Sequence, residues 1–187
     1  MTRVVRLDPL LAGRWSPRGF DPAHVLTPAD LELLLEAARW APSSGNGQPT
    51  RWVVARRGSP LHGRLVEALS GGNRNWAPRA SALLFALIPA GPFPAGERPH
   101  GWDRHDAGQA AAHLSVQAVA LGLQAHQMAG FDAAAVRAAA GLGPDLEPVV
   151  VVAVGALGGP ALPDGLAQRE ARKRTRLPLD ELVLRQE

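Results

Sequence analysis

The 187-residue sequence contains no cysteine. Without thiols the chain cannot form a disulfide framework, present a thiolate nucleophile or hold a cysteine-ligated zinc or iron–sulfur cluster. Apolar runs approaching the roughly 20 residues of a membrane span are also lacking. The N-terminal stretch MTRVVRLDPLLAG has no sustained apolar core ahead of a cleavage site. We therefore expect a cytoplasmic protein that does not enter a membrane.

Lysine is almost absent, because Lys173 is the only lysine among 20 basic residues, and the formal net charge is only +3. The basic residues nevertheless crowd near the C-terminus, at Arg169, Arg172, Lys173, Arg174 and Arg176. The positive charge is local and does not amount to a general nucleic-acid-binding field. This segment is either a solvated basic tail or the place where an anionic group binds.

Several familiar catalytic motifs are missing as well. There is no P-loop, and no GxGxxG joins a strand to a helix, so we do not expect a Rossmann dinucleotide site. The spacing of His100, His105 and His113 does not set two of them on one helical face with a carboxylate, which predicts no metal site. Ser43 and Ser44 lack a GxSxG context, so a hydrolase is only the weaker alternative.

What the sequence does contain is the composition of a globular protein, 46% hydrophobic and 20% charged. At this length we expect one domain spanning residues 1–187. The stretch GGPALPDG at 158–165 separates the last predicted strand from residues 160–187, which are expected to form an arm. An arm that leaves its own core usually embraces a partner, so a homodimer is expected.

Helix and strand signals alternate along the chain. Thr27 is suited to cap a helix with Pro28 in its first turn, and Pro42 ends that helix near Trp40. The apolar run at 149–154 is typical of a strand covered on both faces. The other predicted elements are strands at 51–57, 81–89 and 122–128, helices at 61–69, 106–121 and 133–140, and loops at 41–49 and 90–99.

Four short motifs occur in order along most of the chain. They are RWSPRGF at 14–20, APSSGNGQP at 41–49, AGFD at 129–132 and RTRLPL at 174–179. Together they resemble the flavin-dependent nitroreductase family, in which an R-x-S-x-R segment, a P-S-S-x-N-x-Q-P loop, a G-F-D turn and a basic residue ahead of a proline recur in this order. Asp106, with the alanine-rich helix that follows it, also resembles the central helix of that family.

The resemblance implies an α+β, nitroreductase-like fold with a central, mostly antiparallel sheet flanked by helices. It further implies an intertwined homodimer that exchanges its C-terminal arms and holds two FMN molecules at the subunit interface. NADPH or NADH would be the electron donor.

The same resemblance assigns roles to the basic residues. Arg14 and Arg176 match positions that contact the FMN phosphate, Arg174 assists them, and Ser16 donates a hydrogen bond. The phosphate is a dianion that guanidinium groups bind in a bidentate manner, so the chemistry agrees. Arg18 matches a basic residue beside the pyrimidine end of the flavin, where a fixed cation stabilises the reduced form.

The remaining cofactor-binding positions carry no charge. The loop residues would reach the flavin from the partner subunit, Asn73 or the competing Asn75 would bind the flavin edge, and the backbone of the AGFD turn would face flavin N5. These positions are Trp15, Pro42, Ser43, Ser44, Asn46, Gln48, Asn73, Met128, Ala129 and Gly130. Asn73 could instead cap the turn that follows it. Two positions depart from the family pattern, Trp76 where a basic or polar group is common and Thr50 where a Trp is common.

The implied activity is a ping-pong hydride transfer through flavin N5 from NAD(P)H to a small planar acceptor such as a nitroaromatic compound, a quinone or an activated alkene. No side chain need be a nucleophile. The alternatives within the fold are azoline oxidation, dehalogenation and flavin fragmentation. A flavin carrier or sensor without turnover is a further alternative, suggested by Thr50 and Trp76. A flavin-free dimer whose arginine arm binds nucleic acid is the remotest reading.

Overall fold

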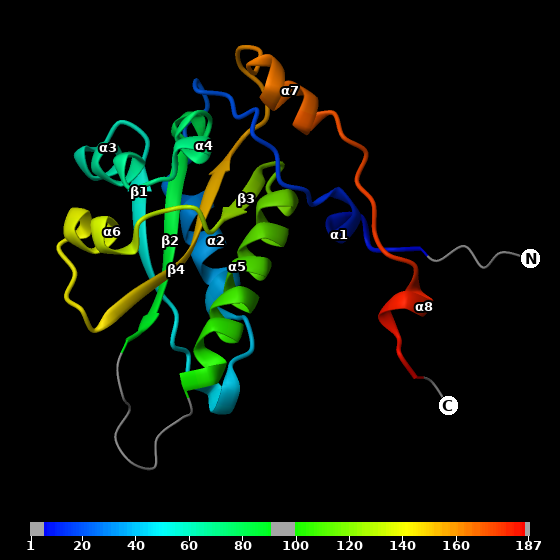
Figure 1. The fold of residues 1–187 in the computed structure, drawn as a ribbon, viewed down its shortest axis with the longest axis horizontal. Coiled ribbons are helices and arrows are strands. Elements are labelled where there is room, and N and C mark those ends of the chain that lie inside the picture. Colours follow the sequence, from blue (N-terminus) through cyan, green and yellow to red (C-terminus); the bar gives the residue numbers. More distant parts are fainter. Residues whose placement is uncertain (1–5, 91–99, 186–187) are drawn as a thin grey trace, which may run out of the picture.

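The computed structural model describes residues 6–90 and 100–185 and has an α+β architecture (Figure 1). Its strands form one four-stranded sheet in the order β1-β2-β4-β3, and each neighbouring pair is antiparallel. The strands are β1 Arg51–Arg56, β2 Ala82–Pro89, β3 Gln124–Met128 and β4 Leu146–Gly155. The predicted fold class and the predicted strands are therefore confirmed, with β4 extending further at both ends than its apolar run.

The helices are α1 Pro9–Gly13, α2 Pro28–Arg39, α3 Pro60–Glu67, α4 Gly71–Arg74, α5 Asp103–Ala120, α6 Ala133–Ala140, α7 Asp164–Glu170 and α8 Leu179–Leu182, with short 3₁₀ turns at Ser44–Asn46, Ala77–Arg79 and His100–Trp102. Helices α3 and α6 cover one face of the sheet, and α2 and α5 cover the other. Thr27 caps α2 as predicted, by accepting a hydrogen bond from the Asp30 amide. The helix expected to start at Asp106 begins at Asp103. Helices α1, α4, α7 and α8 were not predicted, because elements of four to seven residues are too short to show a clear apolar period.

The central strands carry two hydrophobic cores, one on each face. In β2 and β4, Phe85 and Val151 point to the core under α3 and α6, whereas Leu84 and Val152 point to the core under α2 and α5. All four side chains are fully buried. This alternation is the period of two that a strand imposes, and it explains why a continuous apolar run was needed at 149–154.

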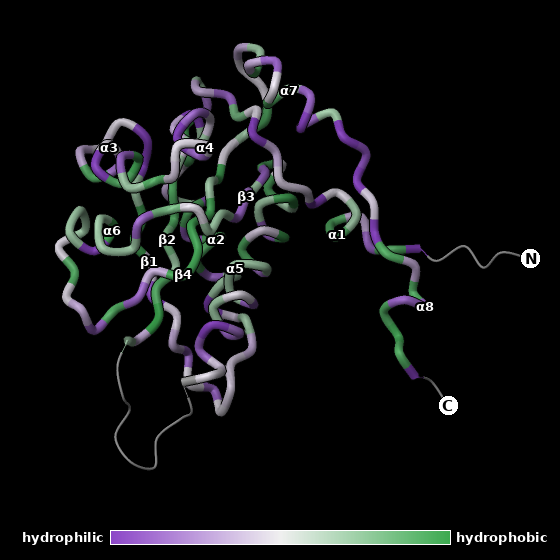
Figure 2. The backbone as a smooth tube through the Cα atoms, viewed as in Figure 1, coloured by the Kyte–Doolittle hydropathy of each residue, from purple (hydrophilic) through white to green (hydrophobic). Residues whose placement is uncertain are grey.

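The C-terminal arm, residues 160–185, leaves the body after β4 (Figure 1). It runs through α7 and an extended stretch to α8, and it passes beside the N-terminal segment that carries α1. Hydrophilic residues dominate the stretch after α7, and hydrophobic residues reappear towards the C-terminus (Figure 2). The exposed apolar side chains of this arm are Leu177, Leu179, Leu182, Val183 and Leu184.

Nearly all of the predicted loop at 90–99 falls at residues 91–99, outside the described part of the chain. Among residues 6–90 and 100–185, no helix combines the length and the hydrophobicity needed to traverse a bilayer.

A buried aromatic stack joins the sheet to the N-terminal segment. Trp76, which is 1% exposed, lies between Phe20 and His126, with ring centroids 6.2 Å and 4.4 Å away. The His126 Nδ1–H donates to the Pro17 carbonyl at 2.7 Å. Burial lowers the pKa of His126 to about 4, and the charges of Arg18 and Arg14 add to this effect while the hydrogen bond to Pro17 opposes it. His126 is therefore neutral at neutral pH.

We expect His126 to make the fold sensitive to acid. In the unfolded chain a histidine titrates near its ordinary pKa of about 6.5, so between that pH and about 4 the unfolded state binds more protons. Stability should fall by about 2 kcal/mol from pH 7 to pH 5 through this residue alone. His126→Gln, which keeps a donor for Pro17, should flatten this slope in urea unfolding. Part of the slope should remain, because burial also lowers the pKa of His62.

The control for that experiment is His113→Gln, which alters an exposed histidine on α5. It should leave the slope unchanged. An equal acid dependence in the parent protein and in His126→Gln would contradict the assignment to His126.

Candidate cofactor site

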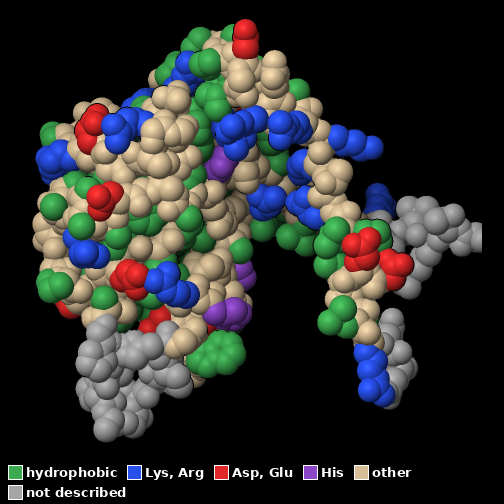
Figure 3. All heavy atoms as spheres, in the orientation of Figure 1, with side chains coloured by type: hydrophobic (Ala, Val, Ile, Leu, Met, Phe, Trp, Pro, Cys, Tyr) green, Lys and Arg blue, Asp and Glu red, His purple; other side chains and the backbone are tan. Residues whose placement is uncertain are grey.

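The N-terminal segment and the C-terminal arm together form an arginine-lined cavity of about 230 Å³. Figure 3 shows Lys and Arg side chains gathered along the arm and on the body facing it. The lining residues are Arg14, Trp15, Ser16, Arg18, Arg169, Glu170, Arg172, Arg174 and Arg176. We call this cavity the arginine pocket. It contains all six residues of these two segments that were predicted to bind the cofactor: Arg14, Trp15, Ser16, Arg18, Arg174 and Arg176. Arg14 and Arg174 meet here although 160 positions separate them in the sequence.

The arm reaches the N-terminal segment by direct contacts. The Arg174 Nη1 donates to the Arg14 carbonyl at 2.9 Å, and the Arg14 Nη1 lies 3.5 Å from the Ser16 hydroxyl. Burial, followed by the charges of Arg176 and Arg174, lowers the pKa of Arg14. Within residues 6–90 and 100–185, no carboxylate forms an ion pair with any of these three guanidinium groups. Three mutually repelling cations are therefore gathered on one wall of the cavity, a set of donors that suits an anion.

Glu170, at the end of α7, is the residue that sequence reasoning missed. Its carboxylate accepts hydrogen bonds from the backbone N–H of Arg18 at 2.8 Å and 3.0 Å, and from that of Gly19 at 3.0 Å. The arm is thereby fastened to the N-terminal segment. Glu170 is the only acidic residue between positions 165 and 179, but no pattern in the sequence links it to residues 18 and 19.

Asn73 and the AGFD turn form a second part of the site, between α4 and the end of β3. The Asn73 Nδ2 and the Ser70 N–H donate to the Gly130 carbonyl at 3.0 Å and 2.9 Å. A Cβ atom on residue 130 would lie 2.6 Å from the Ser70 Oγ and 2.8 Å from the Asn73 Nδ2, so a larger residue here would have to displace these two side chains. The Asn73 side chain thus holds the turn that follows β3. Asn75 is exposed at the C-cap of α4.

Trp76 does not line the arginine pocket, because its side chain belongs to the core. The guanidinium of Arg18 lies over its ring, 5.9 Å from the centroid. Thr50, the other departure from the family pattern, lines a separate cavity described below.

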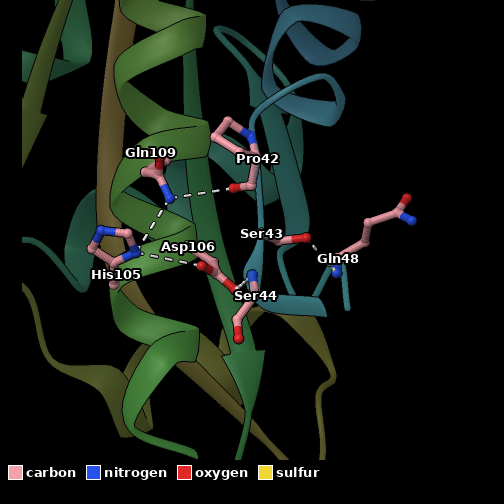
Figure 4. A network of polar contacts seen from close by, with 7 residues as sticks. All are labelled: Pro42, Ser43, Ser44, Gln48, His105, Asp106 and Gln109. Atoms are coloured by element: carbon pink, nitrogen blue, oxygen red, sulfur yellow. Dashed lines mark hydrogen bonds and ion pairs between the residues drawn. The ribbon is translucent and has the colours of Figure 1, made fainter. Parts of the chain in front are cut away.

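Residues 42–48 of the predicted loop at 41–49 lie at the N-terminal end of α5 (Figure 4). The Ser44 N–H donates to the Asp106 Oδ2 at 3.1 Å, the Gln109 Nε2 donates to the Pro42 carbonyl at 3.3 Å, and the Gln48 N–H donates to the Ser43 Oγ at 3.0 Å. These bonds fix the loop on the helix. Asn46 and Gln48 have φ values of 55° and 45°, a conformation that is uncommon for residues other than glycine.

This loop lies far from the arginine pocket in the same chain. Helix α1 packs against α5 near Val119, whereas the loop is bound at Asp106. These positions are roughly 20 Å apart along the helix axis at the usual rise of about 1.5 Å per residue. Pro42, Ser43, Gln48 and Thr50 line their own cavity of about 340 Å³, between α2, α5 and β1. A single chain therefore does not bring the two halves of the predicted site together.

Residues 6–90 and 100–185 contain no group of three or more His, Asp or Glu side chains arranged to hold a metal ion.

Comparisons with known proteins agree with this geometry. The family model described as "Nitroreductase family" matches residues 11–156. A crystal structure described as an oxidoreductase containing FMN superposes with a TM-score of 0.84 at 34% identity, covering 97% of this chain and 92% of that one. A candidate nitroreductase of Desulfovibrio desulfuricans, solved in complex with FMN, has a TM-score of 0.76 at 25% identity and covers 97% of this chain and 99% of that one.

A relative from Mycolicibacterium smegmatis, an uncharacterized 15.4 kDa protein of the ask 5′ region, is 38% identical over 142 residues. The match covers 71% of this chain and 93% of the relative. The family model spans the N-terminal pocket segment, the loop at 42–48 and the turn at 129–132. On the sequence match, the fold and these neighbours, the chain belongs to the nitroreductase family, and its neighbours support an oxidoreductase.

Proposed function

We propose that the protein is an FMN-dependent NAD(P)H oxidoreductase that works as a homodimer. The observation that carries the proposal is the arginine pocket, in which Arg14, Arg174 and Arg176 converge without a carboxylate partner among the described residues. FMN differs from riboflavin by a phosphate dianion, and this donor set suits that group. Two neighbours in the comparisons are FMN-containing proteins.

The donors fit the phosphate by number and by type. Arg14, Arg174 and Arg176 would hold it, and the Ser16 hydroxyl at the Arg14 guanidinium would add a neutral donor. Glu170 also lines the pocket, but its two oxygens accept the backbone N–H groups of Arg18 and Gly19. The Glu170 carboxylate therefore binds backbone N–H groups and not the guanidinium groups, which would remain available to the phosphate.

When bound, FMN would supply hydride transfer from NADPH or NADH to an oxidised acceptor. Arg18 would place its cation beside the pyrimidine end of the cofactor, where negative charge accumulates on reduction. The backbone at Ala129 and Gly130 would supply N–H groups at the opposite edge, in a turn held by Asn73. The acceptors we propose are small, planar and electron-poor, such as nitroaromatic compounds, quinones or activated alkenes.

A second copy of the chain would complete the site. The loop at 42–48 lies about 20 Å along α5 from the pocket segment of its own chain, so the loop that reaches the cofactor would come from the partner. The arm also exposes Leu177, Leu179, Leu182, Val183 and Leu184, a set of apolar side chains that favours packing on another surface. We propose that the arms exchange between the two subunits from Leu177 onward, because the stretch up to Arg176 is held on its own chain.

The test of this function is the visible spectrum of the protein after reconstitution with FMN, desalting and anaerobic addition of NADPH and then NADH. Retained flavin that loses its colour supports the proposal. Comparing nitroaromatic, quinone and alkene acceptors with this reduced protein then identifies the substrate class. Retained flavin that neither cofactor bleaches would favour a carrier, a sensor or an azoline-type oxidase. A colourless protein would contradict FMN binding altogether.

Arg176→Ala should release FMN and leave a folded dimer. The change removes at least one charge-assisted hydrogen bond, so the Kd for FMN should rise about 10- to 100-fold. The measurement is flavin content after dialysis, with circular dichroism and light scattering to confirm fold and assembly. Arg137→Ala, on α6 and outside the pocket, is the matched control. Flavin content equal to that of the parent protein would remove Arg176 from the phosphate site.

Arg18→Ala should retain FMN but slow its reduction by NAD(P)H. Loss of a fixed cation worth about 1.4 kcal/mol in the transition state corresponds to a rate about tenfold lower. Stopped-flow bleaching under anaerobic conditions measures this rate, and Arg18→Lys should recover part of it because the charge returns. An unchanged rate in Arg18→Ala would exclude Arg18 from the mechanism.

A further inference from the structure

The guanidinium of Arg18 is held in a different way from the other cations of the arginine pocket. Within the described residues it has no carboxylate partner at ion-pair distance. It lies instead over the face of the Trp76 indole, 5.9 Å from the ring centroid. The negative face of an aromatic ring attracts a cation by about 0.5 to 2 kcal/mol, depending on solvent exposure. The Trp76 ring thus holds the Arg18 guanidinium in place without neutralising its charge.

The Trp76 ring is itself rigidly fixed. It stacks on Phe20 with an interplanar angle of 21°, and the His126 ring lies against it at a centroid distance of 4.4 Å. The exposed fractions of Trp76, Phe20 and His126 are 1%, 0% and 8%. Side chains buried this closely do not change rotamer without disturbing their neighbours. Trp76 therefore presents a stationary surface to the guanidinium.

The backbone on either side of the Arg18 side chain is fixed as well. His126 donates to the carbonyl of Pro17 at 2.7 Å, and Glu170 accepts the N–H of Arg18. Because burial lowers the pKa of His126 to about 4, its ring adds no second positive charge near Arg18 at neutral pH. The Cα of Arg18 and its guanidinium are both held, so the long side chain between them has little freedom.

We infer that Trp76 is a positioning residue whose indole face fixes the Arg18 guanidinium at the wall of the arginine pocket, so that the cation stabilises reduced FMN over oxidised FMN. This inference rests on the proposed function. An arginine side chain that moves freely loses rotamer entropy, up to about 2 kcal/mol, when it engages a developing charge. A guanidinium already fixed on a ring avoids that cost, which is how a preorganised charge acts.

The experiment compares Trp76→Phe, which keeps an aromatic face, with Trp76→Leu, which keeps an apolar side chain without one. The first readout is the Nε–Hε signal of Arg18 in the NMR spectrum of the flavin-free protein. Ring current from Trp76 should shift this signal upfield in the parent protein and, by a smaller amount, in Trp76→Phe. The shift should disappear in Trp76→Leu.

The second readout is the ratio of the affinities for reduced and oxidised FMN, obtained from the midpoint potential of the bound flavin. Trp76→Leu should lower this ratio three- to tenfold, and tenfold corresponds to about 30 mV for a two-electron couple. Trp76→Phe should restore most of it. Adding Trp76→Leu to Arg18→Ala should cause no further loss, because the two residues act through one guanidinium.

An unchanged ratio in Trp76→Leu would overturn the inference. So would additive losses in the double variant, since Trp76 would then act independently of Arg18. A parent protein that binds no FMN contradicts the proposed function, and in that case the Arg18 signal still decides whether Trp76 holds the guanidinium. If Trp76→Leu does not fold, His126→Gln removes one side of the stack, and it should weaken both readouts in the same direction.

Discussion

The carboxylate of Glu170 accepts the backbone N–H groups of Arg18 and Gly19, and the candidate site depends on this interaction. The two segments that it joins lie near opposite ends of the chain. Hydrogen bonds from main-chain N–H groups to an ionised carboxylate are among the stronger ones in proteins. Because α7 is fastened here, Arg174 and Arg176 are carried to the guanidinium of Arg14.

The length of α5 explains why one chain holds only part of the site. Its C-terminal end supports α1 and the N-terminal pocket segment, whereas its N-terminal end holds the loop at 42–48 through Asp106. An 18-residue helix sets these supports far apart. A cofactor that uses both sets of residues therefore needs two chains, and the exposed apolar arm offers a means of joining them. The proposed dimer thus follows from the length of α5.

Much of the fold could be predicted from the sequence, because local patterns determine it. Thr27 and Pro28 mark the start of α2, and the apolar run at 149–154 marks a central strand whose alternate residues enter two cores. The convergence of Arg14, Arg18, Arg174 and Arg176 was predicted from motifs in a fixed order, which composition and periodicity could not have supplied. The contribution of the loop at 42–48 to the flavin site of a partner subunit stays a prediction.

Other features depend on contacts between distant segments, and local signals do not contain them. Glu170 looked like a surface residue of a basic arm, because nothing nearby in sequence indicates that it binds residues 18 and 19. Trp76 was interpreted as a departure from the family pattern near the cofactor. Its ring instead lies in the core, with the Arg18 guanidinium over it. The tertiary contacts, and not the residue types, decide both roles.

The central proposal is that the arginine pocket binds the FMN phosphate. The direct measurement is a fluorescence titration of the flavin-free protein with FMN and with riboflavin, which differ only in that phosphate. Two or more charge-assisted hydrogen bonds predict that FMN binds at least about 100-fold more tightly than riboflavin, with the difference shrinking as salt is added. Equal affinities for the two flavins would show that the arginines do not hold the phosphate, and would contradict the account.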